Sequence, residues 1–283
     1  MTPTTDPLSS TDGRETTDGL SVSSTQAARS GRQVVFSFFR YPRRHAPSAF
    51  ILMGFQHWVA GNRLPAGMVR LMGCGGRDGF SIVPDFHRYC LMSALDDPTQ
   101  QARVRQSRLY RWVADPSVEQ LHFTLVPATG HGTWDGQAVF DYSGERVGKG
   151  PFAVLTHARV TRPHAKDFWR SVPDVRQGLR DTPGCAYHIG FGEHPFLTLA
   201  TFSVWQDLAS MQAFAYRKTA HNRTRKSARD EHWLTESLFA RFAIERIDGD
   251  LSEYPKLRRL ADAGLMQNVT MAPADAAGRD ART

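Results

Sequence analysis

One histidine in the C-terminal third of the chain lies in a pattern that could bind a metal ion or a haem. After Asp207, apolar residues recur at the spacing of one helical face, and this face, extended seven residues beyond Phe214, reaches His221. The stretch from 217 to 229 contains no acidic residue and six basic ones: Arg217, Lys218, Arg223, Arg225, Lys226 and Arg229. A neutral imidazole on an apolar face is a good iron ligand, and guanidinium groups such as those of Arg217 and Arg225 can pair with haem propionates.

The same pattern also fits a histidine at the edge of a core, on a helix whose basic side chains are solvated. The residues alone leave both interpretations open. The other histidines are scattered and form no pair at the i, i+4 spacing of a helical zinc site. The chain also lacks the GxxxxGK[ST], HExxH, GxSxG and CxxCH motifs, which disfavours a P-loop nucleotide site, a zinc protease, an α/β-hydrolase and c-type haem attachment.

Two further segments have residue types of interest. The glycine-rich turn from Gly73 to Gly79 follows a strand pattern, but it leads to another strand and not to a helix, so it predicts a loop and no dinucleotide site. In the strand 185–191, alternation places His188 between Ala186 and Gly190 on one face. These small neighbours predict either close packing of another element, which we favour, or room for a ligand. Trp205 is expected in the core.

Composition limits the class of protein. The 283 residues carry a formal net charge of +7, which favours anionic partners, and 41% are hydrophobic, enough for a sizeable core. No apolar run approaches the roughly 20 residues of a membrane-spanning helix, and the polar N-terminus does not read as a signal peptide. Three widely separated cysteines indicate free thiols in a reducing compartment, so we expect a cytoplasmic protein. The basic run has no interleaved aromatics, which argues against nucleic acid.

The order of patterns indicates an α+β protein built from two similar halves. Strands are expected at 34–39, 68–74, 87–95 and about 119–126, and again at 152–160, 185–191, 197–205 and 239–247. Helices are expected at about 47–60, from 96–98 onward, at about 163–179 and after 207. Each half then has the βαββαβ order of a ferredoxin-like unit, and two such sheets can pair face to face.

The expected boundaries follow from the same patterns. They are a disordered N-terminal arm (1–32), a first ferredoxin-like half (33–126), a glycine-rich linker (127–150), a second half that contains the candidate haem helix (151–260) and a disordered tail (261–283).

Three stretches together resemble the spheroidene monooxygenase family of carotenoid biosynthesis. They are RLMGCG at 70–75 with GF at 79–80, GFGE at 190–193 with TFSVW at 201–205, and MQAFA at 211–215 running to His221, Trp233 and ESLFARF at 236–242. The resemblance covers about 33–247 and is strongest after residue 150. The motifs are specific in combination and weak singly.

This resemblance implies a dimeric α+β barrel that uses haem, O2 and reduced ferredoxin to convert an acyclic carotenoid such as spheroidene to its 2-keto form. It also implies that His221 is the axial iron ligand, while no residue is placed on the opposite side of the haem. The expected chemistry is two oxidations of one carbon, followed by loss of water from a gem-diol. The basic helix could contact an anionic membrane surface.

Two other functions remain open at this point. One is a monooxygenase of the same fold without a cofactor, which would be colourless and active without iron. The other is a non-catalytic module that binds a hydrophobic ligand or an acidic partner and consumes no O2.

Overall fold

The computed structural model describes residues 33–45, 47, 50–51, 53–54, 68–76, 79–193, 197–216, 233–266 and 270–272. The chain divides into units 1–30 and 31–283, and every described residue belongs to the second. The described strands are β1 (Gln33–Arg40), β2 (Met68–Gly75), β3 (Pro84–Leu95), β4 (Glu119–Gly132), β5 (Phe152–Val160), β6 (Cys185–Gly192), β7 (Thr198–Trp205), β8 (Leu234–Gly249) and β9 (Thr270–Ala272).

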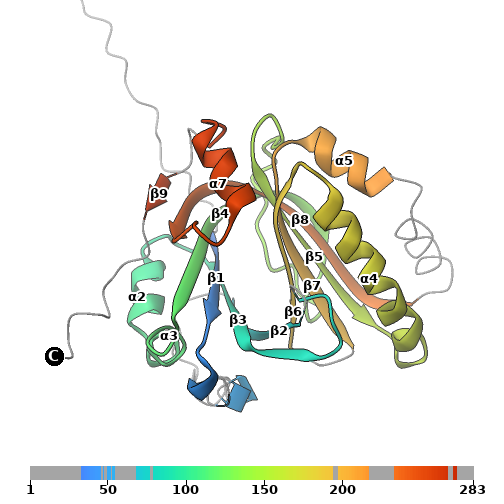
Figure 1. The fold of residues 1–283 in the computed structure, drawn as a ribbon, viewed down its shortest axis with the longest axis horizontal. Helices are drawn as coiled ribbons and strands as arrows, with labels where there is room; N and C mark the ends of the chain where they lie inside the picture. The colour runs from blue at the N-terminus through green and yellow to red at the C-terminus, as the bar shows by residue number, and fades with distance from the viewer. Residues whose placement is uncertain are drawn as a thin grey trace, which may run out of the picture. The chain divides into compact units, whose positions relative to one another are not determined.

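Eight of these strands close into an antiparallel barrel (Figure 1). The strand order is β4-β1-β3-β2-β6-β7-β5-β8, and a pairing of β4 with β8 completes the ring. The ninth strand, β9, pairs in parallel with the end of β8. Closure leaves no free edge on the eight strands, and a barrel of this size is just wide enough for side chains to fill it.

The helices lie around the barrel, and the last of them contributes Leu257 and Leu260 to the core that fills its interior. They are η1 (Arg43–His45), α2 (Gln100–Gln106), α3 (Arg108–Ala114), η3 (Arg162–His164), α4 (Ala165–Asp181), α5 (Leu208–Tyr216) and α7 (Pro255–Asp262). Helix α4 packs on β6, and α5 packs on β7 (Figure 1). No helix within the described residues is both long and apolar enough to cross a membrane.

The predicted α+β class is confirmed, and the chain forms one antiparallel barrel. The strands of the first half follow the order β4-β1-β3-β2, and those of the second follow β8-β5-β7-β6. The halves meet edge to edge, through β2–β6 and β4–β8. The two apolar sheet faces do bury against each other, as expected, but the sheets are also joined at both edges into one ring, which the sequence did not predict.

Several element boundaries differ from the predicted ones. Strand β4 continues to Gly132, inside the expected linker 127–150, because it pairs with β8 along its length. In the expected tail 261–283, residues 270–272 form β9. The predicted helix after Pro98 is two helices, since Ser107 is extended, ends α2 and caps α3 by accepting a hydrogen bond from Tyr110 N. Of the predicted helix 47–60, only 47, 50, 51, 53 and 54 are described.

The barrel interior is packed with apolar and aromatic side chains. Alternate residues of each strand point inward, as in Val34, Phe36 and Phe38 of β1. The ring centroid of Phe36 lies 4.9 Å from that of Phe202, and the ring centroid of Phe123 lies 5.0 Å from the same ring. Large fully buried rings of this kind dominate core energetics. The interior is therefore the core of the fold.

Candidate active site

The three residues predicted to bind haem, His221, Arg217 and Arg225, lie outside the described residues. The described residues on either side of this segment do locate its two ends. At one end, α5 lies beside the C-terminal part of α4, because a Cβ on Gly178 would be 3.0 Å from the Phe214 ring. At the other end, the Trp233 ring stacks on His164, just before α4, with centroids 5.7 Å apart. The described residues on either side, Tyr216 and Trp233, thus lie near opposite ends of α4.

The sheet face on the outside of β5 and β8 is a candidate site for chemistry. Strand register places Thr156 of β5 beside Phe239 of β8, and Phe239 beside His131 of β4. Thr156 and His131 are exposed, and Phe239 is half-buried. The His131 and Phe239 rings stack with centroids 5.7 Å apart. This row presents a hydroxyl, an aromatic ring and an imidazole on one outward face.

Arg241 adds a cationic donor to the same face. It lies two residues after Phe239 on β8, so both side chains point outward, and its guanidinium carbon is 5.3 Å from the Phe239 ring centroid. Its Nε is buried and has no hydrogen-bond partner among the described residues. A buried donor of this kind needs an acceptor, which a carboxylate or another anionic group could supply. The sequence placed Arg241 in the family-like stretch but did not indicate where its side chain points.

The strand that contains His188 shows close packing. A Cβ on Gly190 would lie 2.5 Å from the Gly79 carbonyl oxygen, so the loop after β2 rests directly on this strand. The Phe80 ring from this loop meets the His188 ring at a centroid distance of 5.8 Å. The favoured prediction of packing is confirmed. The glycine-rich turn does lead from β2 to β3, and Trp205 is buried, with its Nε1 donating to Ser203 Oγ at 2.9 Å.

The barrel interior offers no room for a long substrate within the described residues. Apolar and aromatic side chains fill the interior, and the cavity beside Phe38 and Tyr187 measures about 10 Å³. Such a volume holds about one water molecule at most. A substrate site is therefore expected on the outside of the barrel or at its surface.

The cysteines do not provide a reactive thiolate. Cys74, Cys90 and Cys185 are buried and free. Burial is the largest cause that raises the pKa of each thiol, to about 12 for Cys185. The thiols therefore stay protonated near neutral pH. Among the described residues, no group of three or more His, Cys, Asp or Glu side chains is arranged to hold a metal ion.

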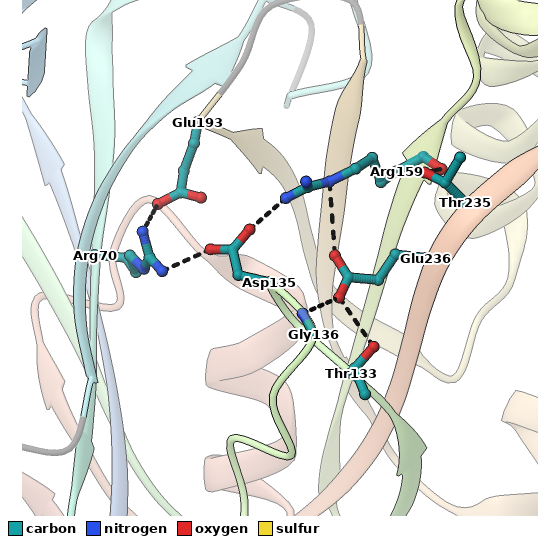
Figure 2. A network of polar contacts seen from close by, with 8 residues as sticks. All are labelled: Arg70, Thr133, Asp135, Gly136, Arg159, Glu193, Thr235 and Glu236. Carbon is teal, nitrogen blue, oxygen red and sulfur yellow. Dashed lines mark hydrogen bonds and ion pairs between the residues drawn. The ribbon is translucent and has the colours of Figure 1, made fainter.

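A network of charged side chains links the two halves (Figure 2). Arg70 of β2 bonds Asp135 Oδ2 through Nη2 at 2.6 Å and lies 3.3 Å from Glu193 Oε1 through Nη1. Arg159 of β5 bonds the other oxygen of Asp135. Its Nε is 3.6 Å from Glu236 Oε2. The network joins β2 and the end of β6 to β5 and β8, through the turn that follows β4.

Glu236, which belongs to β8 in the second half, binds this turn through hydrogen bonds. Its Oε1 accepts hydrogen bonds from Gly136 N at 2.7 Å and Thr133 Oγ1 at 2.9 Å. Burial disfavours the charged carboxylate, but these hydrogen bonds and Arg159 outweigh it and lower the pKa of Glu236. The carboxylate therefore stays ionised, which suits a structural anchor.

An aromatic pair is buried beside the network. The Trp134 and His157 rings are nearly parallel, with centroids 4.2 Å apart. Burial lowers the pKa of His157 to about 4, with further contributions from Glu236, which raises it, and Arg159, which lowers it. His157 is therefore neutral at physiological pH and packs as an uncharged ring. We assign both the network and this pair to the stability of the barrel.

Comparison with known proteins gives a consistent set of relatives. No family model matches the chain. Spheroidene monooxygenase of Rhodobacter capsulatus is 33% identical over 184 residues, which cover 64% of this chain and 76% of that protein. The spheroidene monooxygenase of Rubrivivax gelatinosus is 33% identical over 215 residues, covering 72% and 80%. That of Cereibacter sphaeroides is 33% identical over 180 residues, covering 62% and 55%.

Solved structures give weaker matches. A crystal structure of aldoxime dehydratase is 14% identical, with a TM-score of 0.48, and covers 77% of this chain and 83% of that one. A cofactor-independent oxygenase from Streptomyces nogalater is 14% identical, with a TM-score of 0.28, and covers 33% and 92%. The fold described above rests on the strand pairings of this chain.

Proposed function

The chain belongs to the spheroidene monooxygenase family, and we propose that it is a carotenoid monooxygenase that converts an acyclic, spheroidene-like carotenoid to its 2-keto derivative. The observation that carries this proposal is the 33% identity to proteins of that name over most of their length. Each oxidation consumes one O2, two electrons and two protons. It inserts one oxygen atom into a C–H bond and releases the other as water. Two oxidations of one carbon give a gem-diol, which loses water to give the ketone.

We propose haem as the cofactor and reduced ferredoxin as the electron donor. Haem, when bound, supplies the activation of O2. The described residues fit such a group in one respect: Arg241 offers a buried, unpartnered Nε–H donor beside an aromatic ring on the outward face of β8. We propose that Arg241, Arg217 and Arg225 would pair with the propionates and that His221 would bind the iron.

This chain's own residues then provide binding and orientation. The half-buried Phe239 ring, beside the exposed Thr156, offers an apolar wall against which a ligand can lie. Thr156 contributes an exposed hydroxyl on the same sheet face. An apolar wall of this kind excludes water from the reacting carbon, and fixed donors orient the ligand.

We also propose a finer description of the fold and its setting. The strand orders β4-β1-β3-β2 and β8-β5-β7-β6 support two tandem ferredoxin-like halves of the dimeric α+β barrel type. Because a carotenoid dissolves in a membrane, we propose a cytoplasmic enzyme that contacts an anionic bilayer. The basic residues between 217 and 229 are one source of attraction to it.

An absorption spectrum tests the cofactor. Protein purified from cells supplied with a haem precursor should show a Soret band that shifts on dithionite reduction and again with CO. The variant His221→Ala should lose this haem signal, while His131→Ala should keep it. A protein that turns over carotenoid without colour or iron would instead establish the cofactor-free monooxygenase. Full haem retention in His221→Ala would refute the ligand assignment.

A further inference from the structure

A cluster of exposed apolar side chains lies beside the end of β1. Within the described residues, Phe50, Ile51, Ile82, Val83 and Phe86 are large hydrophobic residues with exposed side chains, and Ile51 and Val83 are 58% and 65% exposed. The first two come from a helical segment after β1, and the other three from the β2–β3 connection and the start of β3. The two groups meet, because the Phe50 and Phe86 ring centroids are 5.3 Å apart. We call these five residues the apolar patch.

A basic cavity adjoins the apolar patch. It has a volume of about 540 Å³, and its lining residues are Arg40, Tyr41, Pro42, Arg43, Asp85, His87 and Arg88. Asp85, His87 and Arg88 flank Phe86 of the patch along β3. The lining contains three arginines and one acidic residue, and Arg44 is exposed next to Arg43. The carboxylate of Asp85 and that of Glu119, which pairs with Arg40, offset this positive charge only in part.

The combination of exposed apolar side chains and neighbouring guanidinium groups is complementary to an anionic bilayer, which has an apolar interior and negatively charged headgroups. A monomeric protein rarely exposes a contiguous apolar cluster without a binding role. Side chains such as Phe and Ile bury themselves below the headgroups, while Arg binds the phosphate oxygens above them. A protein partner would also fit exposed apolar residues. The juxtaposition with a cavity rich in Arg favours anionic phosphate groups.

We propose that the apolar patch and the basic cavity form the membrane-docking surface of this protein, with the cavity taking the headgroup phosphate of an anionic lipid. This proposal rests on the proposed function in one respect: an enzyme whose substrate is dissolved in a membrane needs a surface that docks there. Binding to vesicles can be measured without turnover or cofactor, so failure of either proposal is seen separately.

Co-sedimentation of the full-length protein with vesicles tests the surface. The probes are phosphatidylcholine vesicles with and without phosphatidylserine. The double variant Phe50→Ser with Val83→Ser should weaken partitioning to both kinds of vesicle about tenfold or more, because its apolar area no longer enters the bilayer. The variant Arg43→Glu should weaken binding to the phosphatidylserine vesicles alone and reduce its dependence on salt.

Matched controls separate this surface from unspecific effects. Leu265→Ser removes a large apolar residue that is also exposed, near the end of α7, and Arg170→Glu reverses an exposed charge on α4. Both should bind vesicles as the unchanged protein does. The proposal is overturned if the patch and cavity variants bind like the controls. It is also overturned if only reversal of basic residues between 217 and 229 abolishes binding, or if the patch captures an acidic protein and ignores vesicles.

Discussion

At the scale of the residue, Gly79 and Gly190 have no side chains, and this allows their backbones to approach each other closely. A Cβ on Gly79 would lie 1.9 Å from the Gly190 carbonyl oxygen, and Gly79 has a φ of +87°, in the left-handed region. Any other residue at Gly79 would therefore meet both a steric clash and an unfavourable backbone conformation. The glycine-rich turn brings Phe80 against His188, and so it has a packing role.

Replacing Gly79 with Ala should lower the free energy of unfolding by about 2–4 kcal/mol, from backbone strain and the clash together. Gly136→Ala is the matched control. Gly136 also has a positive φ, of +74°, but no atom lies within 4 Å of its ideal Cβ, so its cost should be only about 1 kcal/mol. Urea unfolding of both variants measures the difference. Equal losses would show that the Gly79–Gly190 contact does not constrain the loop.

The sequence predicted the packing around His188 but did not predict the position of the Arg241 side chain. Small residues on either side of a histidine are a local signal, and alternation gave their face directly. The position of Arg241 over the Phe239 ring depends on which strands pair with β8. A local sequence pattern does not contain that information. The available signal was the i, i+2 spacing of an aromatic and a basic residue on one strand face, within the stretch that resembles the family.

At the scale of the element, the charged network fastens the turn after β4 to strands from both halves (Figure 2). In that turn, Asp135 and Gly136 both have positive φ values, typical of a tight hairpin turn with the sequence Asp-Gly. Asp135 pairs with Arg70 of the first half and Arg159 of the second. The side chains of Arg70 and Asp135 are 21% and 33% exposed, so their pairing is screened less than that of a surface pair.

A double-mutant cycle with Arg70→Met and Asp135→Asn should give a coupling free energy of about 1 kcal/mol that falls as salt is added. Asn tolerates the positive φ of position 135, so this change removes the charge and keeps the turn. The exposed pair Arg170 and Asp167 on α4 serves as the control cycle, with at most about 0.5 kcal/mol expected. A coupling no larger than the control would mean that the network does not fasten the halves.

Elements with strong local patterns were predicted, and those that depend on distant partners were not. The strands from 152 to 160 and from 185 to 191 are apolar or alternating, and both appear at nearly the predicted residues. The end of β4 is rich in glycine and polar residues, and its strand geometry comes from pairing with β8, more than a hundred residues away. Strand β9 similarly exists through its pairing with β8.

At the scale of the whole molecule, barrel closure gives a filled interior, so we propose that the substrate site lies on the outside. The two edge-to-edge joints turn two four-stranded sheets into one ring, whose interior is filled by aromatic side chains. The order of the elements predicted two similar halves, but the choice between stacking and closure depends on edge contacts that the sequence pattern does not contain. The predicted ligand His221 lies outside the described residues, so its role stays a prediction.

The central claim is that this chain is a carotenoid monooxygenase, and isotope-labelled turnover tests it most directly. The purified protein would be incubated with spheroidene in lipid vesicles, reduced ferredoxin and ¹⁸O2, and the product analysed by mass spectrometry soon after mixing. The account predicts a 2-keto carotenoid whose oxygen comes from O2, since both oxygens of the gem-diol derive from it. Unchanged spheroidene, or a product whose oxygen comes from water before exchange can occur, would contradict it.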